Sequence, residues 1–136
     1  MSTYTQIYYH VVFSTKDRVP ALAAARREEL FRYIWGILKN KDCHLYRING
    51  VDDHVHILAS LHPTLALSDF VKIVKTSTSN WIREKMVFPE FTHWQDGYGA
   101  FTVSHGDRDT VIEYIKNQEE HHRHVSFQDE FREMLF

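Results

Sequence analysis

The stretch GVDDHVHILASL, residues 50–61, places two histidines on either side of one valine. Imidazole nitrogens bind divalent metal ions, and two histidines spaced this way on a strand share one face, about 6–7 Å apart at the backbone. A His-x-His triplet is weak evidence alone, because ten histidines in 136 residues give about 0.7 such triplets by chance. The pattern leaves open whether His54 and His56 bind a metal or form an exposed or hydrogen-bonded pair.

A second group of polar side chains lies in VIEYIKNQEEHH, residues 111–122. At about 100° per residue, a helix brings Tyr114, Gln118 and His121 to within about 60° of one another, away from the apolar positions. A phenol, a carboxamide and an imidazole on one face are groups that could complete a site begun by the histidine pair. The same spacing also fits a half-buried tyrosine beside a solvated amide, so both interpretations stay open.

Length and composition restrict the class of protein. A chain of 136 residues with 43% hydrophobic and 14% aromatic residues is expected to form one folded domain, residues 1–136. The single cysteine, Cys43, excludes an internal disulfide, and no signal peptide or membrane span is recognisable, so we expect a cytoplasmic protein. The net charge of −2 requires any nucleic-acid binding to depend on a local basic patch.

Hydrophobic periodicity predicts alternating strands and helices, with a hairpin turn at Asn49 and Gly50. The order β-α-β-β-α-β followed by helices predicts an α+β, ferredoxin-like sheet, as in RNA-recognition domains. We expect helices on one face of the sheet, and further C-terminal helices that carry the tyrosine. The expected strands are residues 5–13, 43–48, 54–61 and 97–104, and the expected helices are residues 22–40 and 67–85, one from about 107 and one after Ser126.

Alternation within residues 54–61 predicts the direction of each side chain. The aliphatic residues Val55, Ile57 and Ala59 are expected to pack beneath the helices. His54 and His56 are then expected to point to the open face of the sheet.

Five stretches distributed along the chain form a recognisable set: YYHVVFSTKDR, the HVH triplet, LSDFVKIVKTSTSNWI, WQDGYGAFTVS and YIKNQEEHH. Together they resemble the single-tyrosine HUH transposases, the transposase A proteins of small insertion sequences, and the resemblance covers nearly the whole chain. It implies a ferredoxin-like homodimer that cleaves and rejoins single-stranded DNA at hairpin-marked element ends, with Mg²⁺ or Mn²⁺ as cofactor. It also implies that His54, His56 and Gln118 bind the metal and that Tyr114 is the nucleophile, forming a 5′-phosphotyrosine.

The implied chemistry suits these residue types. A tyrosine hydroxyl has a pKa of about 10, so at neutral pH it needs a polarised phosphate and a route for its proton. Imidazoles alone would favour zinc, whereas the amide oxygen of Gln118 and the phosphate oxygens favour a hard ion such as Mg²⁺. The resemblance also implies a hinge at Gly106, and leaves open whether the tyrosine helix acts within its own chain or in the partner subunit.

Capture of a single strand requires positive charge and flat aromatic rings. The chain offers such residues near the end of the first strand, on the second helix and beside the last strand, although each also fits a surface charge or a core aromatic. His121, His122 and His124 are interpreted as solvated helix-end residues outside the catalytic set. The expected DNA-binding residues are Lys16, Arg18, Lys72, Lys75, Arg83, Trp94 and Tyr98.

Three other functions remain as alternatives. One is a domesticated, repeat-associated tyrosine transposase, placed second because the chain lacks the long extensions associated with that branch. Another is a non-catalytic module that binds single-stranded nucleic acid on its sheet. The third is a metal-dependent hydrolase that uses His54, His56 and one histidine of residues 121–124.

Overall fold

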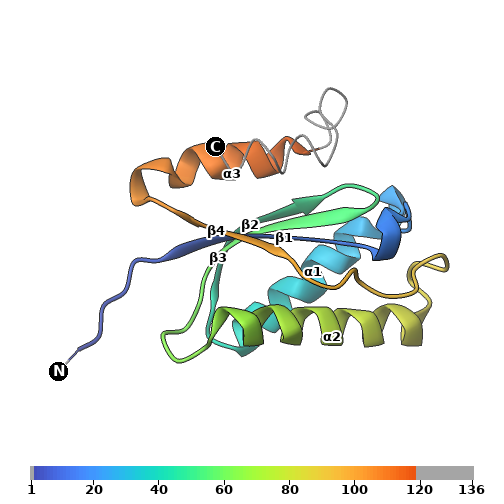
Figure 1. Cartoon of the computed structure of the whole chain (residues 1–136), viewed down its shortest axis with the longest axis horizontal. Helices are drawn as coiled ribbons and strands as arrows, with labels where there is room; N and C mark the ends of the chain where they lie inside the picture. The colour runs from blue at the N-terminus through green and yellow to red at the C-terminus, as the bar shows by residue number, and fades with distance from the viewer. Residues whose placement is uncertain (1, 119–136) are drawn as a thin grey trace.

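The computed structural model describes residues 2–118, which form one four-stranded antiparallel sheet with helices on both faces (Figure 1). The expected element order and the α+β ferredoxin-like class are confirmed. The helix expected after Ser126, and His121, His122 and His124, lie outside the described residues. The strands are β1 (Tyr8–Ser14), β2 (His44–Gly50), β3 (His54–Ser60) and β4 (Gly99–Val103), and the helices are α1 (Ala24–Asn40), α2 (Leu67–Lys85) and α3 (Arg108–Lys116).

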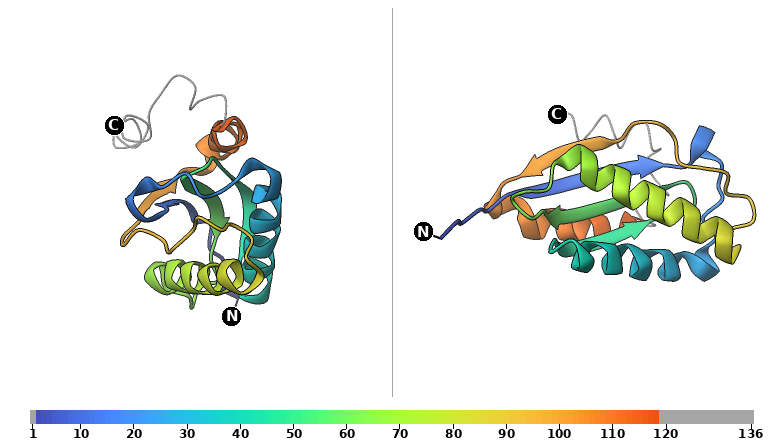
Figure 2. Two further views of the ribbon diagram at one scale, coloured as in Figure 1. Left: turned by 90° about the vertical axis from the view of Figure 1, so that its right-hand side faces the viewer. Right: turned by 90° about the horizontal axis from the view of Figure 1, so that it is seen from below.

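The main core lies between the sheet and the pair α1 and α2, which lie side by side across it (Figure 2). The sheet has the order β2-β3-β1-β4, so the two central strands β3 and β1 supply most of the apolar side chains beneath the helices. The predicted alternation is confirmed on this face. The core includes Val11 and Phe13 of β1, Val55, Ile57 and Ala59 of β3, Leu30, Ile34 and Leu38 of α1, and Phe70, Val74 and Ile82 of α2.

α3 packs on the opposite face of the sheet, so this face is not open as expected (Figure 1). Ile115 is fully buried in a small apolar cluster with Tyr8 and Leu58. The side-chain amide of Asn49 donates a hydrogen bond of 3.0 Å to the carbonyl of Lys116, at the end of the helix. The apolar residues of α3 bury their surface against the sheet, and in doing so they place the helix over the histidines.

The β2–β3 connection differs from the expected Asn-Gly turn. Asn49 and Gly50 are the last residues of β2, and residues 51–53 make the turn. A Cβ atom added at Gly50 would clash with the main-chain carbonyl oxygen of His54. Glycine is therefore required because the start of β3 passes directly against the end of β2, and this close approach fixes the position of His54.

Gly50→Ala is expected to lower the free energy of unfolding by about 1–3 kcal/mol, because the backbone at His54 must move to admit the methyl group. Gly36→Ala in α1 is the matched control. A Cβ at Gly36 meets no atom within 4 Å, and alanine there is expected to stabilise the helix by about 0.5–1 kcal/mol. Urea denaturation followed by circular dichroism measures both variants, and an unchanged midpoint for Gly50→Ala would contradict the close approach.

Within residues 2–118, none of the helices combines the length and the apolar character that crossing a lipid bilayer requires.

Candidate active site

His54 and His56 lie next to each other on β3, beneath α3. Their ring centroids are 5.0 Å apart, and both side chains are 0% exposed. They pair across β1 with Ser14 and Val12, which places them on the face opposite the main core. The sequence correctly paired these two side chains on one face, but the prediction that this face is open is wrong because α3 covers it.

Both imidazoles are held through the Nδ1 atom. His54 Nδ1 lies 2.7 Å from Oδ1 of Asp53, the residue before it in the chain. His56 Nδ1 lies 2.8 Å from Nε2 of His10 on β1. A histidine that donates from Nδ1 keeps a lone pair on Nε2, the arrangement found where Nε2 binds a metal. Both rings are therefore contacted at Nδ1, His54 by a carboxylate and His56 by another imidazole.

Tyr114 and Gln118 come from α3 and the residues just after it. The Tyr114 ring lies 5.9 Å from the His56 ring and 6.2 Å from the His10 ring, in both cases edge to face. The buried side chain of Gln118 donates from Nε2 to the carbonyl of Tyr114 at 3.2 Å. The structure thus brings the phenol and the paired imidazoles together within one chain, with the carboxamide one helical turn from the phenol.

The side chains available at this site determine which metal ion it could bind. No group of three or more His, Cys, Asp or Glu side chains suited to a metal occurs in the described part of the chain. The candidate donors are instead two imidazoles and one neutral amide. The Oε1 atom of Gln118 is buried and accepts no hydrogen bond from any of residues 2–118, so a cation would satisfy it. Such a mixed nitrogen and oxygen set fits a divalent ion whose other positions hold water or phosphate oxygens.

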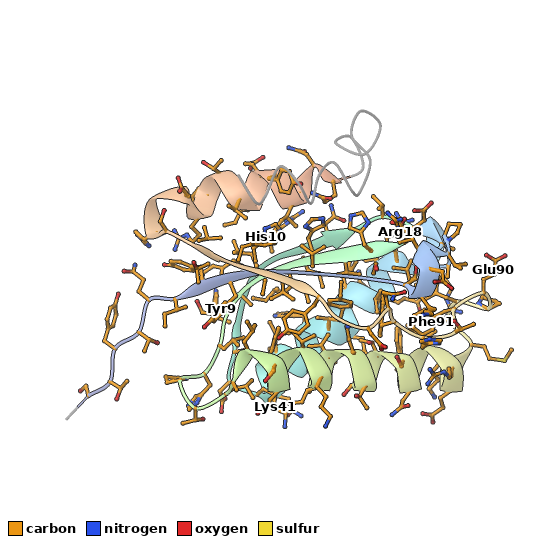
Figure 3. All side chains as sticks on the ribbon, viewed as in Figure 1. Tyr9, His10, Arg18, Lys41, Glu90 and Phe91 are labelled. Carbon is orange, nitrogen blue, oxygen red and sulfur yellow. The ribbon has the colours of Figure 1, made fainter. Side chains whose placement is uncertain are left out.

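Besides Asp53, which contacts His54, one further site residue was not identified by sequence analysis, and this residue is His10. It is a buried histidine on β1, on the strand face that also carries Tyr8 and Val12. Figure 3 shows His10 on the α3 side of the sheet and its neighbour Tyr9 on the side of α1 and α2. The available signal was a lone histidine in the otherwise apolar run YYHVVF.

Trp94, one of the predicted DNA-binding residues, is buried in the core. Its ring packs edge to face against Phe13 at 4.8 Å and Phe91 at 4.9 Å, and only 4% of the residue is exposed. Its indole Nε1 donates a hydrogen bond of 2.9 Å to Oγ1 of Thr78. The prediction that Trp94 stacks on bases is wrong, because both the ring and its polar atom are used inside the core.

Two of the predicted DNA-binding cations hold the connection between α2 and β4. Lys75 Nζ donates to the carbonyls of Gln95, at 2.8 Å, and Gly97. Burial lowers the pKa of Lys75, and the nearby Asp96 carboxylate opposes part of this shift. Arg83 donates from Nε and Nη2 to the carbonyl of Thr92, at 3.1 and 2.8 Å. These bonds fix the loop against α2.

The remaining predicted DNA-binding residues lie on the surface. Lys16 and Arg18 lie in the short helix η1 (Lys16–Arg18) that follows β1, and Arg18 is labelled at one end of the molecule in Figure 3. Lys72 is exposed on α2, and Tyr98, just before β4, is 41% exposed. For these four residues, contact with single-stranded DNA stays a prediction.

Gly106 lies in the short helix η2 (His105–Asp107) that links β4 to α3. Its backbone does not adopt a positive φ, and an added Cβ would meet no atom within 4 Å. In this conformation no steric reason requires glycine, and the hinge stays a prediction.

Comparison with known proteins gives consistent matches along the chain. The family model described as "Transposase IS200 like" matches residues 3–118. The chain is 27% identical over 120 residues to the ISDra2 transposase TnpA of Deinococcus radiodurans, a match that covers 83% of this chain and 84% of that protein. It is 25% identical over 115 residues to the transposase for insertion sequence element IS200 of Salmonella typhimurium, a match that covers 81% of this chain and 75% of that protein.

Two solved structures share the fold. A Deinococcus radiodurans protein assigned as a transposase superposes with a TM-score of 0.67 at 25% identity, covering 87% of this chain and 95% of that chain. A REP-associated tyrosine transposase, solved bound to a REP hairpin, superposes with a TM-score of 0.64 at 14% identity. This match covers 86% of this chain and 72% of that chain.

Proposed function

The chain belongs to the IS200-like transposase family, and on that premise we propose that it cleaves and rejoins single-stranded DNA at hairpin-marked element ends through a 5′-phosphotyrosine. The observation that carries this proposal is the position of Tyr114 beside His56, with ring centroids 5.9 Å apart. The proposed nucleophile lies about 60 residues after the two histidines in the sequence, so its position beside His56 is a consequence of the fold. We propose a cytoplasmic enzyme that acts as a homodimer.

The proposed reaction exchanges one phosphate ester for another. The hydroxyl oxygen of Tyr114 attacks the scissile phosphorus and loses its proton, while the bond from phosphorus to the 3′ oxygen breaks. The products are a DNA end joined to Tyr114 through its 5′ phosphate and a free 3′ hydroxyl. Attack by a 3′ hydroxyl of another strand reverses the step, and no nucleotide cofactor is needed because the ester bond is conserved.

His54, His56 and Gln118 would hold a divalent ion, which we propose to be Mg²⁺ or Mn²⁺. When bound, such an ion acts as a Lewis acid on the phosphate and absorbs the charge that develops on its oxygens. Asp53 orients the His54 ring through a hydrogen bond of 2.7 Å. The close approach of the His54 main chain to Gly50 fixes the backbone position of His54. These residues hold the site without taking part in bond exchange.

We propose single-stranded DNA hairpins as the partner. Membership of the transposase family supports this choice, and one protein of the same fold has been solved bound to a hairpin. Lys16, Arg18, Lys72 and Tyr98 are the surface residues that we expect to contact the strand. Lys75 and Arg83 remain in the proposed DNA-binding set, and we propose that they act by positioning the loop between α2 and β4.

The test uses single-stranded DNA that carries the palindromes flanking this gene, labelled at either the 5′ or the 3′ end. We expect a protein–DNA adduct that survives detergent and carries the 3′ label, because Tyr114 retains the 5′ phosphate of the downstream fragment. An adduct with the 5′ label would contradict the proposed polarity. Release of both labelled ends without an adduct would indicate the hydrolase, and intact bound DNA would indicate a binding module.

A further inference from the structure

His10 lies against the candidate metal site without being one of its donors. Across the β1–β3 ladder it is paired with Leu58, so it is the diagonal neighbour of His56 on the same face. The two rings are tilted by 34° with centroids 5.0 Å apart, and His10 Nε2 lies 2.8 Å from His56 Nδ1. Only 4% of His10 is exposed, so this contact is made inside the protein and not at its surface.

A hydrogen bond between two neutral imidazoles has two possible directions, since the shared proton belongs to one ring or the other. If His56 donates, its Nε2 keeps a lone pair and can bind a cation. If His10 donates, the Nε2 atom of His56 carries the hydrogen and cannot bind one. The direction of this one bond therefore decides whether His56 can act as a ligand.

We propose that His10 is a positioning residue that accepts the hydrogen bond from His56 and holds its ring with Nε2 presented to the metal. The inference rests on the proposed function, because it takes His56 to be a metal ligand. Asp53 makes the equivalent contact to His54, at 2.7 Å. Asp53 is the chain neighbour of the histidine that it holds, whereas His10 comes from another strand and depends on the register between β1 and β3.

The contact also fixes the geometry of His56. The ring of His56 is fully buried between His10, His54 and Tyr114, all within about 6 Å by ring centroid. Partners that orient a metal-binding histidine typically contribute about 10–100-fold in metal affinity or activity. Loss of the acceptor at position 10 removes the hydrogen bond that favours the Nδ1–H tautomer of His56, and a buried N–H that loses its acceptor is costly.

The test measures Mn²⁺ binding to the protein without DNA, by electron paramagnetic resonance. His10→Phe keeps a flat ring and removes the acceptor, and it is expected to weaken Mn²⁺ binding by about 10–100-fold. His10→Gln retains a side-chain acceptor and is expected to stay within about threefold of wild type. His62→Phe, the same substitution in the loop after β3, is the matched control and is expected to bind like wild type. A folded His10→Phe variant with wild-type affinity would overturn the inference.

A second measurement needs no variant and holds even if His10→Phe does not fold. Nitrogen-15 NMR of the histidine rings, at a pH where they are neutral, reports the tautomer of His56. We expect hydrogen on Nδ1, and hydrogen on Nε2 would overturn the inference. If wild type binds no Mn²⁺, the proposed metal site itself fails. If wild type binds Mn²⁺ and His10→Phe binds it equally, only the role of His10 fails.

Discussion

Tyr114→Phe is expected to abolish covalent adduct formation and to reduce strand cleavage by at least about 10³-fold. The substitution removes the only atom that attacks the phosphate and keeps the ring that packs against His10 and His56. Fold and DNA binding should therefore be retained. A denaturing gel of the labelled hairpin reaction measures the adduct, and a gel-shift assay measures binding.

Tyr33→Phe is the matched control for this variant. Tyr33 stacks on Trp81 with ring centroids 4.6 Å apart, where α1 meets α2, and it has no part in the proposed reaction. It is expected to form adduct at the wild-type rate. Adduct formation by Tyr114→Phe at a comparable rate would mean that another residue is the nucleophile, and the proposed reaction would be wrong.

Removal of divalent metal with EDTA is expected to reduce cleavage below detection, and added Mg²⁺ or Mn²⁺ is expected to restore it. The reason is that the proposed ligands, two imidazoles and the buried amide oxygen of Gln118, are neutral. Without a bound ion they do not compensate the negative charge of the phosphate. Hairpin binding should persist in EDTA, because it depends on surface cations. Cleavage at the full rate after exhaustive chelation would exclude the metal role given to His54, His56 and Gln118.

The sequence was sufficient for the elements whose signals are local. The helix predicted over residues 67–85 is α2, and the hairpin around the NGVDD stretch is β2 and β3. The pairing of His54 with His56 on one face follows from strand geometry alone. β1 begins at Tyr8 and not at residue 5, because pairing to β4 begins at Tyr8 and pairing to β3 begins at Tyr9, which a single segment does not reveal.

What the sequence did not reveal depends on contacts between distant segments. His10 faces His56 only because of the register between β1 and β3, and the continuous apolar run around it hides which face each residue takes. Trp94 lies in a loop with no periodicity, so its burial against Phe13 could not be inferred. The position of α3 over the histidines depends on Ile115 entering a cluster built from β1 and β3.

The burial of the paired histidines has an energetic consequence for DNA binding. Because His54 and His56 are fully buried, a phosphate can reach them only after local movement of the side chains that cover them, with Tyr114 still on the same face. These covering side chains then compete with substrate inside the same molecule, and the measured dissociation constant equals the intrinsic one divided by the accessible fraction. The tightness of packing above the two imidazoles thereby sets the DNA concentration that the enzyme requires.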